Sequence, residues 1–376
     1  MNYCGIDLGG MSSYAFVTEE HGRKLWSGPV ETTRSAFERL VKEFLPQGLA
    51  IAIEAGNQTA WVHEELRKLG AKVVVVNPNQ VKLIAESRRK TDKVDAKILC
   101  ELLRLSGLPH PVHMPGNQAR ELRGLLAARR QLITARAKLS NVVRGMLRQT
   151  GVRLPARALS TLVGWQRLFN AGFEHDHLLH IVAAYHQSFV ALTQSIRELD
   201  RQLADREENE PRAARLKTMP RVGCIAALTF LAAVDDVTRF SSSRKLIGYS
   251  GLAPTVRQSS DRTRYGAISR QGRPELRTIW VQIAHLVARD RTKATLQLRN
   301  WFNRVAARRG KKTAVVALAR RLLVIAYQLL KTESDYDVSR LRKKCPAAVH
   351  WGKNQRPQVL PPDPQLLPSS LCPRKS

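Results

Sequence analysis

Acidic side chains, cysteines and long apolar runs are all scarce in this chain of 376 residues. The five cysteines are odd in number and lack the paired spacing of disulfide frameworks or zinc sites, so we expect them to be reduced and structural. No uninterrupted apolar run approaches the roughly 20 residues that span a bilayer, and Asp7 interrupts the short apolar stretch near the start. The sequence therefore predicts a cytoplasmic protein with no membrane partner.

Positive charge is abundant, with 62 Lys and Arg against 31 Asp and Glu. The formal net charge of +31 favours a polyanionic partner through phosphate neutralisation and counterion release, and nucleic acid is the first candidate. Residues 1–112 hold 15 basic and 13 acidic side chains, a net of +2, so the rest of the chain carries +29. Residues 239–321 are the most cationic, with 20 basic and 3 acidic side chains. We expect most of the electrostatic attraction to nucleic acid to come from residues beyond 112.

Four parts are expected along the chain. Residues 1–112 alternate strand-like and helix-like patterns, which is typical of an α/β domain. Residues 113–210 are predicted to be a basic helical arm, residues 211–331 a mainly helical domain, and residues 332–376 a proline-rich tail that is disordered or extended. Within the α/β domain we expect strands at 2–8, 14–18, 49–53 and 71–76 and helices at 35–44, 59–69 and 95–105.

The arm is predicted to consist of two long helices, because apolar residues recur at helical spacing over 117–149 and 177–208. Two antiparallel helices would form a coiled-coil-like hairpin, and an ordinary helical bundle linker is the equally weighted alternative. Residues 113–153 hold nine basic side chains and one acidic one, so the outer face of the first helix is cationic. Its candidate nucleic-acid contacts are Arg120, Arg123, Arg129, Arg130 and Arg136.

Four carboxylates stand at positions typical of a catalytic metal site. Asp7 and Glu54 each end an apolar strand-like run, and functional groups gather outside the carboxyl ends of strands in an open sheet. Asp92 and Asp95 are three residues apart, which puts both on one face of a helix start. Roles in turns or as helix caps are the alternative for each acid alone. Together the four would repel one another unless divalent cations neutralise them, so the sequence predicts bound Mg²⁺, with Mn²⁺ as a substitute.

These acids also carry a family resemblance. The stretches Ile-Asp7-Leu-Gly, Ile-Glu54-Ala and Lys-Thr-Asp92-Lys-Val-Asp95-Ala resemble the DEDD signature of the Piv-type insertion-sequence transposases in order, spacing and local context. The resemblance covers roughly residues 1–330. It implies an RNase-H-like first domain similar to the RuvC Holliday-junction resolvase, in which the four acids are catalytic and bind the metal.

The resemblance extends to a serine in the second half of the chain. The Gly-Leu-Ala-Pro254 stretch and the Ile-Ser-Arg-Gln-Gly stretch at 268–272 resemble the carboxy-terminal transposase domain of that family. There the loop after Gly-Leu-Ala-Pro supplies a serine nucleophile, which Ser259 matches; Ser260 replaces the usual glycine and is the alternative. Residues 216–228 are similar to a helix-hairpin-helix element, with a plain interhelical turn as the alternative. The cations that could stabilise charge on a phosphate are Arg257, Arg262, Arg264, Arg270 and Arg273.

The resemblance implies DNA transposition by cutting and rejoining of strands. The serine would form a phosphoserine link to DNA while the carboxylates hold the metal, in a homodimer or homotetramer. The implied partners are donor and target DNA and a structured non-coding guide RNA, a bridge RNA that pairs with both, in the nucleoid of a prokaryotic cell. The alternative function is a Holliday-junction-type endonuclease that hydrolyses DNA with the carboxylates alone. A non-enzymatic binding protein is disfavoured, because carboxylates without metal repel phosphate.

Overall fold

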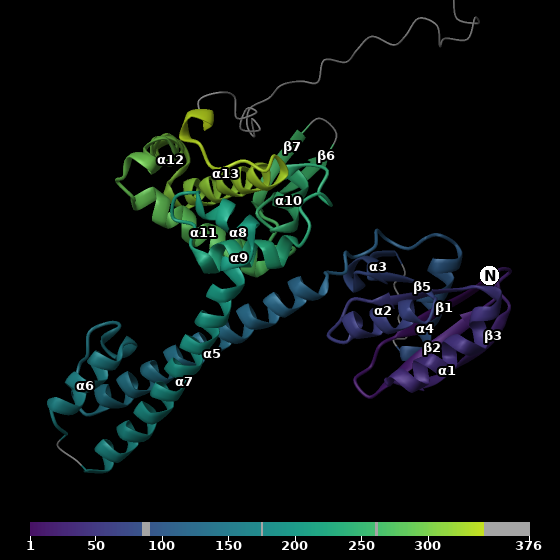
Figure 1. Cartoon of the computed structure of the whole chain (residues 1–376), viewed down its shortest axis with the longest axis horizontal. Helices are drawn as coiled ribbons and strands as arrows, with labels where there is room; N and C mark the ends of the chain where they lie inside the picture. The colour runs from purple at the N-terminus through teal and green to yellow at the C-terminus, as the bar shows by residue number, and fades with distance from the viewer. Residues whose placement is uncertain (85–90, 174–175, 260–261, 342–376) are drawn as a thin grey trace, which may run out of the picture. The chain divides into compact units, whose positions relative to one another are not determined.

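The chain forms two compact units, the first comprising Met1–Pro115 and the second beginning at Gly116. The structure is a computed structural model and describes residues 1–84, 91–173, 176–259 and 262–341 (Figure 1). Each unit buries a hydrophobic core of its own. The predicted tail falls largely outside the described residues, as do Cys345 and Cys372.

The first unit is built on a five-stranded mixed sheet with the strand order β3-β2-β1-β4-β5. Strands β1, β2 and β3 pair antiparallel, whereas β4 pairs parallel to β1 and β5 pairs parallel to β4. The predicted strands are confirmed, and β3 is an addition whose Gly28 and Pro29 are unfavourable in strands and tolerated at a sheet edge. The strands are β1 (Asn2–Asp7), β2 (Ser12–Thr18), β3 (Lys24–Glu31), β4 (Leu49–Glu54) and β5 (Lys72–Val76).

Helices cover both faces of this sheet. Side chains alternate between the faces of a strand, so Cys4 and Ile6 of β1 pack into the core cluster that includes Phe37 of α1 and Leu66 of α2. Gly5, between them, faces α4 instead. The helices are α1 (Arg34–Phe44), η1 (Leu45–Gln47), α2 (Thr59–Lys68), α3 (Pro78–Ile84) and α4 (Asp92–Arg104).

Helix α4 packs unusually close to β1. A Cβ on Gly5 would lie 2.1 Å from the carbonyl oxygen of Ala96 and 2.5 Å from the amide nitrogen of Cys100, so only glycine fits there. The Cys100 thiol donates to the carbonyl oxygen of Tyr3 at 3.2 Å. Burial raises the pKa of both Cys4 and Cys100, which keeps these thiols protonated and supports the prediction that they are structural.

In the second unit, α5 (Asn117–Gln149) and α7 (Asp176–Glu208) lie side by side (Figure 1), which confirms both predicted arm helices. They run antiparallel, because Glu121 near the start of α5 pairs with Arg206 near the end of α7 at 2.9 Å. At the other end of the pair, a small core forms around the buried Trp165 of α6 (Leu162–Asn170), next to η2 (Ala158–Ser160). This packing fits the coiled-coil prediction and the bundle alternative equally.

The remaining helices of the second unit enclose its main core. Helix α9 is buried along almost its whole length, and its Phe230 meets Trp280 of α11 edge to face with 5.7 Å between the ring centroids. Helix α13 is the one helix in the described part of the chain that is long and apolar enough to cross a membrane, and 61% of its apolar window is buried inside the unit. These elements are α8 (Pro211–Lys217), α9 (Cys224–Val234), α10 (Ser243–Tyr249), α11 (Pro274–Arg289), η3 (Lys293–Thr295), α12 (Leu296–Arg309), α13 (Lys311–Lys331) and η4 (Val338–Leu341).

The segment that was expected to be a loop is a two-stranded antiparallel hairpin, β6 (Pro254–Ser259) and β7 (Arg262–Ile268). Its β-branched and aromatic residues, such as Val256 and Tyr265, favour strands more than the many Ser, Arg and Gly residues oppose them. The Ser, Arg and Gly content of the segment masks this preference in the sequence.

Candidate active site and nucleic-acid interface

Asp7 and Glu54 end two neighbouring parallel strands on the same face of the sheet. Ile6 pairs with Ile53 across β1 and β4, so each acid is the next residue beyond this pair. By strand alternation Asp7 shares the face of Gly5, and Glu54 shares the face of Ala52. Gly5 contacts α4, and Ala52 packs in one cluster with Leu99 of α4. Both acids are half-buried, and both interact with other groups of the chain.

The start of α4 lies at the end of the sheet that carries these two acids. The helix runs antiparallel to β1, because Cys100 contacts Tyr3 whereas Ala96 contacts Gly5. The helical turn that precedes Ala96 therefore lies level with the last residues of β1. Asp92 and Asp95 belong to this first turn, the former exposed and the latter half-buried. The backbone thus brings the elements bearing all four predicted acids to one end of one face.

The capping alternative for Asp92 is wrong. Thr91 is the N-cap of α4, and its hydroxyl accepts a hydrogen bond from the amide of Val94 at 3.4 Å. Asp92 is the first helical residue, so its carboxylate is not needed for the cap. A favourable interaction of Asp92 and Asp95 with the helix dipole is compatible with the structure and also with metal binding.

The donor chemistry of the four acids fits Mg²⁺, a hard cation that prefers carboxylate oxygens. Within the residues that the structure describes, however, no three His, Cys, Asp or Glu side chains are arranged to hold a metal ion. The four acids therefore suit a metal ion in the type of their donor atoms and in the positions of their backbones. A closed site requires the carboxylates to turn toward one another about their present backbone positions.

Ser259 is the last residue of β6, where the chain turns back into β7. Its backbone pairs with that of Arg262, and Arg257 pairs with Arg264 further down the hairpin. Residues 260 and 261 lie outside the described residues, so the choice between Ser259 and Ser260 is not tested. Val256 and Tyr265 are 49% and 46% exposed, which shows that the hairpin is open to solvent and accessible to a large ligand.

The base of this hairpin is held by close backbone contacts. Gly272 has a φ of +102°, and a Cβ there would lie 2.1 Å from the carbonyl oxygen of Tyr249. The amide of Arg273 donates to the same carbonyl at 3.0 Å. Arg320 of α13 donates from Nε to the carbonyl oxygen of Leu252 at 2.6 Å. These contacts hold the base of β6 and β7 in a fixed position.

The arginines predicted on the arm have differing surroundings. Arg123 donates to the carbonyl oxygens of Ala232 and Ala233 at 2.6 and 3.2 Å, and burial lowers its pKa. The other four also have polar neighbours within the second unit: Arg120 bonds to Asn117, Arg129 pairs with Asp200, Arg130 lies 3.6 Å from Glu275, and Arg136 donates to Thr193 at 3.3 Å. Contacts of these residues with nucleic acid stay predictions, and the exposed Arg130 is the most accessible of them.

Comparisons with known proteins identify the family of this chain. Residues 4–152 match the family model described as "Transposase", and residues 213–299 match "Transposase IS116/IS110/IS902 family". The two matches cover more than half of the chain; the first contains the four predicted acids and the second contains Ser259. The chain belongs to the IS110 family of insertion-sequence transposases.

Curated relatives of this IS110-family transposase span most of its length. The transposase for insertion sequence element IS1328 of Yersinia enterocolitica is 26% identical over 86% of this chain and 95% of the relative. The transposase for IS1111A of Coxiella burnetii is 24% identical over 78% and 80%, and the pilin gene-inverting protein of Moraxella bovis is 27% identical over 71% and 74%. Among solved structures, RuvC of T. thermophilus in complex with a Holliday junction substrate has a TM-score of 0.24 and 17% identity, over 30% of this chain and 99% of RuvC.

The transposase also has a cationic cluster at the hairpin base, in which Arg239 and Tyr249 join the predicted Arg273 and Arg123. Arg239 stacks on the ring of Tyr249 with 4.5 Å from Cζ to the centroid, and Arg273 donates to the Tyr249 hydroxyl at 3.2 Å. Burial opposes ionisation of Tyr249, but the charges of Arg273, Arg239 and Arg123 outweigh it and lower the pKa of the phenol. These groups are far apart in sequence, so no local pattern could have revealed the cluster.

Proposed function

We propose that this transposase cuts and rejoins DNA by phosphoryl transfer, with Ser259 as the nucleophile and Asp7, Glu54, Asp92 and Asp95 as the ligands of Mg²⁺ or Mn²⁺. The observation that supports this most is that β1, β4 and the start of α4, the elements bearing the acids, meet at one end of one sheet face. A purely structural role would give no reason for elements that bear four acids to meet there, since carboxylates repel one another. The first unit, Met1–Pro115, is proposed to have an RNase-H-like fold.

Each acid has a distinct proposed contribution. Asp7 and Glu54 extend from neighbouring strands, whose hydrogen-bonded ladder keeps their separation constant. Asp92 and Asp95 extend from the helix that Gly5 allows against the same strand. Divalent cations held by these oxygens would neutralise a scissile phosphate and stabilise the charge that develops during the transfer. Because all four carboxylates are proposed to position the metal ions, substitution of any one acid is expected to stop DNA cutting.

Ser259 is proposed to carry the covalent step. Its hydroxyl oxygen attacks phosphorus and loses its proton, a bond between phosphorus and a sugar oxygen breaks, and the released sugar oxygen takes up a proton to become a hydroxyl. A second DNA hydroxyl then attacks the phosphoserine, which restores a phosphodiester and returns the serine hydroxyl. The candidate cations for stabilising the phosphate are Arg257, Arg262, Arg264, Arg270 and Arg273.

The remaining proposed partners are those that the family resemblance implies, and the charge of the chain is compatible with them. Residues beyond 112 carry +29, which suits donor and target DNA and a structured guide RNA that would supply sequence choice by base pairing. We propose residues 1–112 as the catalytic domain, 113–210 as a coiled-coil arm, 211–331 as the serine-bearing domain with a helix-hairpin-helix-like element at α8 and α9, and 332–376 as a tail. The active assembly is proposed to be a homodimer or homotetramer in the cytoplasm, bound to the nucleoid.

The covalent step is tested by trapping the protein on labelled donor DNA with Mg²⁺ and denaturing the mixture. A protein–DNA adduct is expected for the wild type and for Ser260→Ala, and none for Ser259→Ala. Asp7→Asn and addition of a chelator should both prevent the adduct. Hydrolysed free ends without any adduct would reject the serine mechanism and favour the endonuclease that acts through its carboxylates alone.

The guide RNA is tested by purifying the protein from cells that carry its element and sequencing any RNA that remains bound. One structured RNA transcribed from the end of the element is expected. Recombination of matched donor and target DNA should then depend on adding this RNA. Recombination at the same rate without RNA would reject the guide.

A further inference from the structure

A small cavity on the arm is lined, among the residues that the structure describes, by three arginines and no acid. It has a volume of about 260 Å³ and lies between α5, the turn that leads into η2, and α7. Arg136 and Arg144 reach it from α5, and Arg157 reaches it from the turn. The polar residues Ser140, Asn141 and Ser160 complete much of its wall. A water molecule needs only about 10–15 Å³ of such space, so this cavity has room for a larger group.

The three guanidinium groups are held in place differently. Arg136 donates to Thr193 of α7 at 3.3 Å and lies over the ring of Phe189 with 5.5 Å from Cζ to the centroid. Arg144 has a buried Nε with no hydrogen-bond partner among the described parts of the chain. Since a buried charged donor without a partner is costly, the cavity favours an acceptor at this point.

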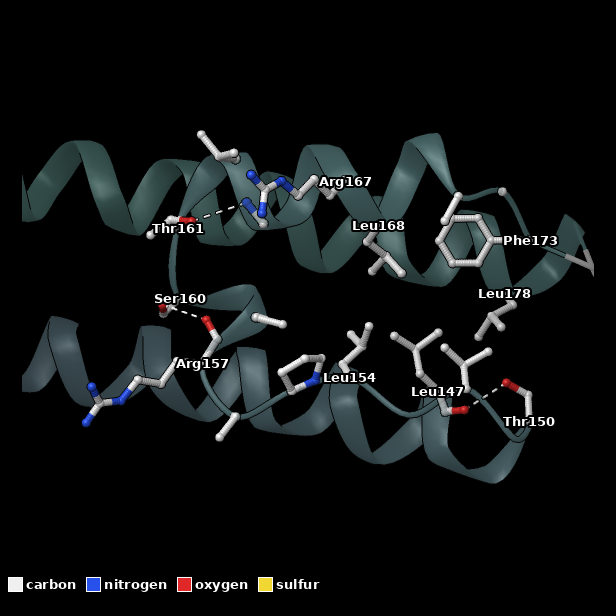
Figure 2. A pocket seen from close by; sticks show the side chains of 18 residues that line it. Leu147, Thr150, Leu154, Arg157, Ser160, Thr161, Arg167, Leu168, Phe173 and Leu178 are labelled. Carbon is white, nitrogen blue, oxygen red and sulfur yellow. Dashed lines mark hydrogen bonds between the residues drawn. The ribbon is translucent and has the colours of Figure 1, made fainter.

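Arg157 is held in a strained backbone conformation, with a φ of +68°. The hydroxyl of Ser160 donates to its carbonyl oxygen at 2.7 Å, and the hydroxyl of Ser140 ties the same turn to α5 through the carbonyl of Leu159 at 2.8 Å. Figure 2 shows the neighbouring, mostly apolar cavity, where the Arg157 side chain is directed away from Leu154, Leu168 and Phe173. A non-glycine residue in this region of φ is unfavourable and often marks a functional position.

We propose that this cavity, defined by Arg136, Arg144 and Arg157, binds a phosphate group of a polynucleotide. Arginine presents a planar set of donors that matches phosphate oxygens, and among the described lining residues no acid balances the three guanidinium charges, so the cavity favours an anion. Exposed Lys138 and Arg153 lie on the same part of the arm, so positive charge extends beyond the cavity as a polymer ligand would require. The proposal rests on the proposed function only in taking nucleic acid as the partner.

The test measures binding of the full-length protein to labelled duplex DNA and to RNA of the same sequence, with a chelator present so that no strand is cut. Arg144→Ala is expected to weaken binding several-fold and to reduce the slope of log K against log salt by about 0.7–0.9, the value of one phosphate contact. Arg144→Lys should restore only part of the affinity, because it keeps the charge and loses the planar donor set. Arg148→Ala removes an equal charge from an exposed position of α5 outside the cavity, and is the matched control.

Arg157→Gly separates binding from folding. Glycine relieves the positive φ, so thermal unfolding should occur at an equal or higher temperature while nucleic-acid affinity falls. Equal losses for Arg144→Ala and Arg148→Ala would overturn the proposal, because binding would then depend only on total charge. Wild-type affinity in Arg144→Ala and Arg157→Gly would also overturn it. Adduct formation is scored separately, so failure of the serine mechanism leaves this binding result intact.

Discussion

Gly5→Ala is expected to inactivate the carboxylate site although no carboxylate is changed. The added Cβ would lie 2.1 Å from the carbonyl oxygen of Ala96, which belongs to the backbone of α4. A backbone atom cannot rotate aside as a side chain can. Helix α4 must therefore move away from β1, and Asp92 and Asp95 must move with it, away from Asp7.

The size of this movement follows from the contact distance. Ordinary van der Waals contact begins at 3.4 Å, so the helix must move by about 1.3 Å if β1 stays in place. Overpacking of this kind typically costs about 1–3 kcal/mol of folding stability. A displacement of about 1 Å at a catalytic site can lower the rate about 100-fold. We expect both effects in Gly5→Ala.

Urea unfolding and the rate of adduct formation with Mg²⁺ measure the two effects separately. Gly10→Ala is the control, because a Cβ at Gly10 meets no atom of the described residues within 4 Å and should leave stability and rate near those of the wild type. The reasoning is refuted if Gly5→Ala has the stability and rate of the wild type. Loss of stability with an unchanged rate would show that the position of α4 does not matter for the chemistry.

Three further changes test other parts of the structure. Thr91→Ala removes the N-cap of α4 and should cost about 1 kcal/mol in urea unfolding. Gly272→Ala would meet the Tyr249 carbonyl at 2.1 Å and should reduce adduct formation by disturbing the hairpin base. Arg221 holds the pKa of the Asp290 carboxyl below its usual range, so the stability that Asp290 adds is present at neutral pH and is lost as pH falls below about 4. The difference in thermal unfolding temperature between Asp290→Asn and wild type should accordingly shrink in acid.

Periodicity in the sequence predicted the long elements well. The arm helix expected at 117–149 has those bounds, and the helix expected at 177–208 begins one residue earlier. Long apolar patterns of this kind leave little freedom in helix position. The Ser, Arg and Gly content between Pro254 and Ile268 is typical of a loop, and it hides the short strands β6 and β7, which pair with each other.

The candidate acids were found from local context, but their common location required the fold. Sequence showed that Asp7 and Glu54 end strand-like runs; it did not show that β1 and β4 are adjacent, which depends on long-range pairing. The cavity of Arg136, Arg144 and Arg157 was not predictable either. It forms where a turn folds back onto a helix, and no spacing in the sequence reports that contact.

The metal site is tested most directly by a crystal structure of the protein grown with Mn²⁺ and measured for anomalous scattering. The account predicts a peak among the carboxylates of Asp7, Glu54, Asp92 and Asp95, with metal–oxygen distances near 2 Å. The peak should disappear in Glu54→Gln. Carboxylates that stay apart in the presence of saturating Mn²⁺, with no anomalous peak between them, would contradict the account.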